Sequence, residues 1–128
     1  VSGDENAASD VEYRCIFIHN AHLTLTWQSV VVWLSAEVAG GANAAIAIDG
    51  VAASAIGSAI AQADEVVNEG TAPTGEAFSS PTTKATGLSL GNLAAGYCRA
   101  VWVRRTAANS AALDNDGATV KAEGDTAA

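Results

Sequence analysis

The stretch "GLSLGNLAAGYCRAVWVRRT", residues 87–106, decides the fold. A Leu-x-x-Gly-Tyr turn, from Leu93 to Tyr97, stands directly before a strand-like run rich in Val, Trp and Arg. Alternation along that run puts successive side chains on opposite faces. One face then carries Cys98, Ala100 and Trp102, and the other carries Arg99, Val101, Val103 and Arg105. A tight turn between two such segments predicts an antiparallel β-structure.

Further strand patterns lie on the N-terminal side of this stretch. Residues 11–20, "VEYRCIFIHN", alternate and have apolar side chains on both faces. Residues 23–37 are too rich in Val, Thr and Trp to favour a helix and too long for one flat strand. We therefore predict two strand segments there, with a bend near Gln28 and Ser29. A short strand in residues 44–50 ends at an Asp-Gly turn.

The remaining connections are less regular. Residues 51–63 are rich in alanine, but Gly57 interrupts them, so a helix and a short strand with loop both remain open. Residues 64–86 hold both prolines and predict a long extended loop, which Phe78 anchors to the sandwich. Residues 118–128 predict a last strand.

Together these patterns predict an all-β fold, an antiparallel β-sandwich without βαβ rhythm. A chain of 128 residues fits one domain of ordinary size. Residues 1–10 are small, polar and acidic and predict a flexible lead-in. Residues 11–128 then form the single β-sandwich domain.

Charge and composition narrow the classes of partner. The chain has 14 acidic and 6 basic residues and a net charge of −8. The negative electrostatic potential of such a chain repels a phosphate backbone, which argues against nucleic-acid binding. It also argues against binding a membrane surface through basic residues. The apolar runs are too short to span a bilayer.

The turn resembles that of immunoglobulin-like and fibronectin-III-like sandwiches. That resemblance implies that Leu93 plugs the corner, Gly96 makes the tight turn and the Tyr97 hydroxyl bonds back to upstream backbone. Cys15, Trp33 and Cys98 also fall in the Cys…Trp…Cys order of immunoglobulin domains. Tyr97 directly precedes Cys98, however, where those domains leave one residue between. The analogy therefore supports a sandwich rather than membership in that superfamily.

Most of the chain also resembles small β-sandwich proteins of tailed-phage virions. The matching pieces are "YRCIFIHN", "LTLTWQSVVVWLS", "GTAPTGEAFSSPTT" and the stretch quoted first. The resemblance implies a non-enzymatic structural protein on the virion surface, made in the host cytoplasm, such as a capsid decoration, spike or tail module. Its partners would be major capsid or tail proteins and sister copies in a homo-oligomer or symmetric array. Loop 64–86 and the terminal segments are the predicted contact surfaces.

Residues that could carry chemistry have simpler interpretations. Cys15 and Cys98 could form a disulfide or remain two buried thiols. His19 and His22 lack a neighbouring third metal ligand. The segment from Asp114 to Gly117 looks like part of a calcium loop, but Asp-Gly is also a common hairpin turn.

Two further candidates concern acid–base chemistry and ligand stacking. Asp64, Glu65 and Glu69 form an acidic edge in a predicted surface loop. Trp27 lies between Thr26 and Gln28 and could be exposed as a sugar-stacking platform, which makes a carbohydrate-binding or adhesin module the alternative function. We predict no catalytic residue, cofactor or bound metal.

Overall fold

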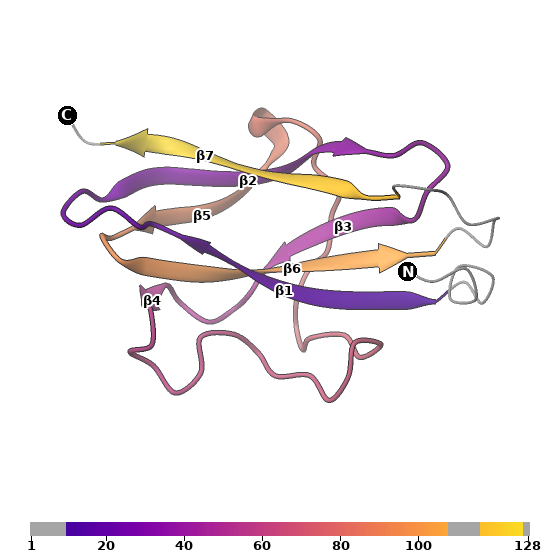
Figure 1. Ribbon diagram of the computed structural model, residues 1–128, viewed down its shortest axis with the longest axis horizontal. Helices are drawn as coiled ribbons and strands as arrows, with labels where there is room; N and C mark the ends of the chain where they lie inside the picture. Colours follow the sequence, from indigo (N-terminus) through magenta and orange to yellow (C-terminus); the bar gives the residue numbers. More distant parts are fainter. Residues whose placement is uncertain (1–9, 108–115, 127–128) are drawn as a thin grey trace.

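The computed structural model describes residues 10–107 and 116–126, and nearly all its regular structure is β (Figure 1). The strands and the one short 3₁₀ helix are, in chain order, β1 (Val11–His19), β2 (Trp27–Glu37), β3 (Asn43–Ile48), β4 (Ser54–Ala55), η1 (Lys84–Thr86), β5 (Leu88–Leu93), β6 (Tyr97–Thr106) and β7 (Ala118–Thr126).

The strands form two antiparallel sheets that pack face to face. The first sheet has the order β1-β6-β3. The two-residue strand β4 also pairs with β6, at the start of that strand. The second sheet has the order β5-β2-β7. In Figure 1 the second sheet lies above the first. The predicted antiparallel β-sandwich is confirmed.

The sheet order matches the immunoglobulin pattern at its centre and departs from it at its edges. β2 and β5 pair as strands B and E of that pattern do, and β3 and β6 pair as C and F do. β1, however, lies beside β6, where the last strand of the pattern belongs, and β7 lies beside β2, where the first belongs. The first and last strands have thus exchanged sheets.

The core between the sheets uses the Val101 face of β6. Its buried members are Val30, Val32, Leu34, Ala44, Ile46, Leu90, Leu93 and Val101. Trp102, Cys98 and Ala100 are also buried, but they lie on the opposite face of the strand, away from the second sheet.

The long connection from β3 to β5 covers that outer face. Small side chains there, Ala45, Ala47 and Ala100, let the connection lie close. Phe78 anchors it, as predicted, with its ring 5.5 Å from that of Tyr13 and 5.1 Å from the Arg104 guanidinium carbon. Figure 1 shows the connection running beneath β1 and β6.

Two local predictions are resolved by this geometry. Residues 51–63 contain the short strand β4 and loop, so the helical alternative is wrong. At Gln28 and Ser29 the register of β2 shifts, and Ser29 adopts a φ of 52°. This irregularity is a β-bulge inside one continuous strand, so the prediction of two separate segments is wrong.

Candidate functional site

A buried carboxylate organises the outer face of the first sheet. Asp49, 1 % exposed, follows β3 where the chain leaves the sheet. Its Oδ2 accepts hydrogen bonds from the Trp102 indole nitrogen at 2.7 Å and the Asp64 backbone nitrogen at 2.8 Å. Its Oδ1 accepts from the Val51 nitrogen at 2.7 Å. Three N–H donors thus compensate the buried charge and fix the start of the covering connection.

The two cysteines are free and lie apart on neighbouring strands. Both cysteines lie on the β1–β6 ladder, but at different positions along it. Cys15 of β1 is opposite Trp102 in the strand register, whereas Cys98 of β6 is opposite His19. The exchange of the edge strands puts both thiols on the same sheet, so they do not form the disulfide alternative. Burial, with a smaller contribution from the Asp49 charge, raises the pKa of the Cys15 thiol to about 11. A thiol this weakly acidic is a poor nucleophile near neutral pH.

The Cys…Trp…Cys order therefore does not form the inter-sheet pin of immunoglobulin domains here. Trp33 lies between Val32 and Leu34, which face the core, so its indole is on the outer face of the second sheet. There the Lys121 ammonium lies 5.4 Å from its ring centroid. Trp102 lies on the outer face of the other sheet.

The third tryptophan is used in packing. Trp27 is half-buried and packs against the inter-sheet core. A Cβ added to Gly124 would lie 2.7 Å from the Trp27 indole nitrogen, so this glycine makes room for the ring. Trp27 is therefore not a fully exposed ring, and the carbohydrate-binding alternative stays a prediction.

At the turn of residues 93–97, the stabilising side-chain hydrogen bonds come from an asparagine and not from the tyrosine that we expected. Leu93 is fully buried and Gly96 has a φ of 75°, as a plug and a tight turn require. Tyr97 is 37 % exposed, and its hydroxyl has no hydrogen-bond partner among residues 10–107 and 116–126. Instead the buried Asn20 amide donates to the carbonyls of Leu25, at 2.8 Å, and Leu93, at 2.9 Å. The predicted tyrosine corner is wrong in this detail.

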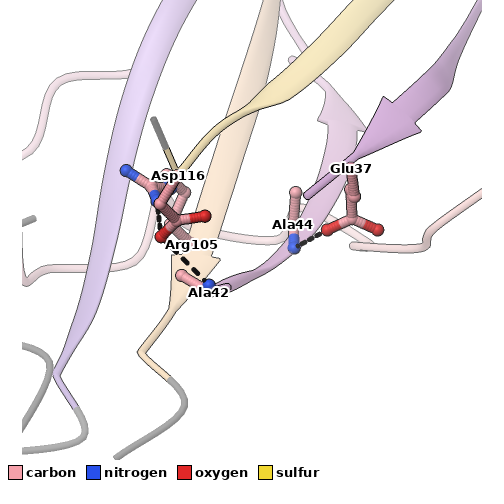
Figure 2. Close-up of polar contacts among 5 residues, drawn as sticks. All are labelled: Glu37, Ala42, Ala44, Arg105 and Asp116. Atoms are coloured by element: carbon pink, nitrogen blue, oxygen red, sulfur yellow. Dashed lines mark hydrogen bonds and ion pairs between the residues drawn. The ribbon is translucent and has the colours of Figure 1, made fainter. Parts of the chain in front are cut away.

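At the opposite end of the sandwich two carboxylates hold the β2–β3 turn (Figure 2). Asp116 Oδ2 accepts from the Arg105 guanidinium at 2.7 Å and from the Ala42 nitrogen at 3.1 Å. Glu37 accepts from the Ala44 nitrogen at 2.6 Å. We call Glu37, Arg105 and Asp116 the carboxylate clamp.

The other ionisable candidates have separate partners. His22 Nδ1 accepts from the Thr24 and Leu25 nitrogens, a local turn contact. Asp64 accepts from the Thr74 nitrogen, and Glu69 pairs with Arg14 at 2.5 Å, so the acidic edge does not act as one group. In the described part of the chain no three His, Cys, Asp or Glu residues gather as a metal site. Asp114 and Asn115 of the calcium-like segment lie outside the described residues.

Two hollows open on the carboxylate-rich end. The larger, about 410 Å³, is lined by Asp10, Val11, Glu12, Glu69 and Gly70. The smaller, about 280 Å³, lies beside the clamp and is lined by residues 36–38 and 117–119. Among the described residues, neither lining contains a cysteine, histidine or serine that could serve as a nucleophile or base.

The other end of the sandwich is apolar. Residues 15–36, 50–63 and 85–98 contain no Asp, Glu, Lys or Arg. Their connections meet at one end, since the Gly96 nitrogen bonds to the Asn20 carbonyl and the Ile56 nitrogen bonds to the Gly96 carbonyl. In Figure 1 this end is on the left. We call it the apolar end; its exposed side chains are Leu23, Leu25, Ile56, Ile60 and Tyr97.

Comparisons with protein-family models, with curated proteins and with solved structures find no match to this chain. Over residues 10–107 and 116–126, no helix has the length and apolar character that a membrane crossing requires. The fold therefore defines the class: a small antiparallel β-sandwich of two packed sheets.

Proposed function

We propose that this chain is a non-enzymatic structural protein of a phage particle surface, a capsid decoration or spike-type module, and that it docks through its apolar end. The occupant of that end is a protein of the particle, a major capsid or tail protein with a low-charge surface. Sister copies complete a symmetric array. The sequence resemblance to virion β-sandwich proteins supplies the location.

One observation carries the proposal: five of the eight large apolar side chains that are exposed in the described residues gather at the apolar end, on stretches of sequence without charged residues. Leu23 is 92 % exposed and Ile60 is fully exposed, in a chain whose net charge is −8. Grouped exposed apolar side chains on a soluble domain are typical of protein contact surfaces.

The rigidity of this end also favours docking. Asn20 ties the β1–β2 connection to β5, and the Gln62 amide donates to the Ala55 carbonyl at 2.8 Å, which holds the loop that carries Ile60. A surface that is already ordered loses little conformational entropy on binding. Loop 64–86, the contact surface predicted from sequence, instead carries four carboxylates on a segment that already covers the first sheet.

The experiment is a rebinding assay on particles from which this protein has been stripped or deleted. The purified wild-type chain should co-sediment with the particles, and the double variant Leu23→Ser/Ile60→Ser should not. The matched control is Val67→Ser, which removes an equally exposed apolar side chain, 89 % exposed, from loop 64–86. Retained binding by the Leu23/Ile60 variant, or its loss in the control, would refute docking through the apolar end. Glycan binding by the wild type with no particle binding would favour an adhesin.

A further inference from the structure

The last strand presents an open edge. β7 is the outer strand of the sheet β5-β2-β7 and runs for nine residues. Within the described ranges its only strand partner is β2, so the backbone groups on its other side are unpaired. The register shifts between these two strands arise from extra residues in β2, so β7 itself stays regular. A long regular edge is a template for another strand.

The other edges are obstructed. At β3, the Ile46 and Ser79 backbones form a bridge. At β1, the Tyr13 nitrogen donates to the Glu69 carbonyl at 2.7 Å. β5 has only six residues, with Gly91 at a φ of 77° where its register with β2 shifts. Irregular and covered edges resist strand addition, and within residues 10–107 and 116–126 the β7 edge is neither irregular nor covered.

The outer face of β7 carries charges of both signs. Val120, Ala122 and Gly124 are partly buried, and Val120 and Ala122 pack against the core. Lys121 and Glu123 alternate with them and therefore lie on the outer face. Their side chains are 56 % and 46 % exposed, and the Glu123 carboxylate is oriented by Lys84 at 2.9 Å.

We propose that two copies of this chain pair through β7, antiparallel, about a two-fold axis at Ala122. This register places each Lys121 opposite Glu123 of the second copy and each Thr119 opposite Asp125. All nine residues of each strand are then paired, and the two three-stranded sheets become one continuous sheet. Opposite charges directly across an antiparallel pair stabilise it.

The alternation of faces leaves few competing registers. In a two-fold antiparallel pair, the core-facing side chains of both copies lie on the same face of the joined sheet only when the axis passes through a residue. The competing registers therefore place the axis at a neighbouring residue of β7. An axis at Lys121 sets that lysine against itself, and an axis at Glu123 sets two carboxylates against each other. Like charges in those positions destabilise the pair. The axis at Ala122 avoids both.

This inference deepens the proposed role of sister copies, and it rests on that role. Its test is the sedimentation of the purified chain over a range of concentrations. The wild type should dimerise, and Lys121→Glu or Glu123→Lys should weaken the dimer about tenfold or more, since each change creates two like-charge pairs about the axis. The double variant Lys121→Glu/Glu123→Lys, which restores opposite charges in the same register, should recover the dimer.

The control is Lys84→Ala, which removes the contact within the chain to Glu123 and should leave the dimer in place. Circular dichroism checks that every variant is folded. A wild type that stays monomeric throughout, or a dimer indifferent to the single charge reversals, would overturn the pairing. A monomer that still binds particles would refute the pairing alone. A β7 dimer that binds no particle would refute the particle role alone.

Discussion

The Trp102 indole donates a buried hydrogen bond of 2.7 Å to the Asp49 carboxylate, on the face of the first sheet that points away from the second. This contact joins the centre of β6 to the residue at which the chain leaves β3. The long connection to β5 starts there and covers the sheet. The protein therefore has two apolar layers, one between the sheets and one beneath the connection.

Removing the Asp49 carboxylate should strongly destabilise the fold. Asp49→Ala leaves three N–H donors without an acceptor, the buried Trp102 indole and the partly buried Val51 and Asp64 nitrogens, so we expect a loss of about 3 kcal/mol or more in the free energy of unfolding. Trp102→Phe removes one of those donors and should cost about 1.5–3 kcal/mol. Urea unfolding of both single variants and the double variant measures the coupling. Strictly additive losses would contradict a direct contact between the two side chains.

The corner should depend on Asn20 rather than on Tyr97. Asn20→Ala leaves the buried Leu93 carbonyl and the partly buried Leu25 carbonyl without their donor and should cost about 2–3 kcal/mol of unfolding free energy. Tyr97→Phe removes a hydroxyl without a described partner and should change it by less than about 0.5 kcal/mol. Thermal or urea unfolding decides the matter. A larger loss in the tyrosine variant would restore the tyrosine corner.

Gly41 should tolerate a side chain only when Asp116 is shortened. A Cβ at Gly41 would lie 2.0 Å from Asp116 Oδ1, and Arg105 and the Ala42 nitrogen hold that carboxylate in place. We expect Gly41→Ala to cost about 1–3 kcal/mol. In an Asp116→Ala background the same change should cost less than half as much. Equal costs in both backgrounds would mean that the clash is relieved elsewhere.

The Cys15 thiol should react slowly, and its reaction rate should keep rising up to high pH. Since its pKa is raised to about 11, its alkylation rate in a Cys98→Ala background should still be rising at pH 10. Asp49→Asn should shift this profile only slightly toward lower pH, because burial is the larger cause. A rate that levels off by pH 9 would contradict the raised pKa.

The same shift has a consequence for stability. Well below pH 9 the thiol is protonated in both the folded and the unfolded state and contributes nothing to the pH dependence of stability. Between about pH 9 and 11 the unfolded chain loses this proton first, so Cys15 should lower the free energy of unfolding as the pH rises. Comparison with Cys15→Ser in urea isolates this effect. Identical pH dependence in the two proteins would exclude it.

Alternation and turn chemistry predicted the strands well. The run before Arg104, the Gly96 turn and the buried Leu93 are local features, and the sandwich follows from them. Residue patterns also located the irregularity at Gln28 and Ser29, although a bulge keeps one strand where a bend was expected. The anchoring of the loop by Phe78 was predictable because it is the lone aromatic residue in a polar segment.

The sheet order and the buried polar contacts were not predictable in this way. Cys15 and Cys98 would lie on different sheets, as a disulfide between the sheets requires, only if the first and last strands kept the immunoglobulin order. The pairing of β1 with β6 is set by contacts between residues far apart in the sequence, which local patterns do not reveal. In the sequence, Asp49 and the glycine that follows it look like an ordinary exposed Asp-Gly turn. Its burial depends on Trp102, more than fifty positions away. The apolar end leaves a trace in the sequence, the three stretches without charge, but only the fold brings them together.

The most direct test of the central claim is gold-labelled antibody imaging of this chain on intact particles produced by the organism that encodes it. The account predicts a regular pattern of label over the particle surface, on the head for a decoration or spike protein or on the tail for a tail module. Label confined to the cell envelope, with none on any particle, would contradict it and favour an adhesin.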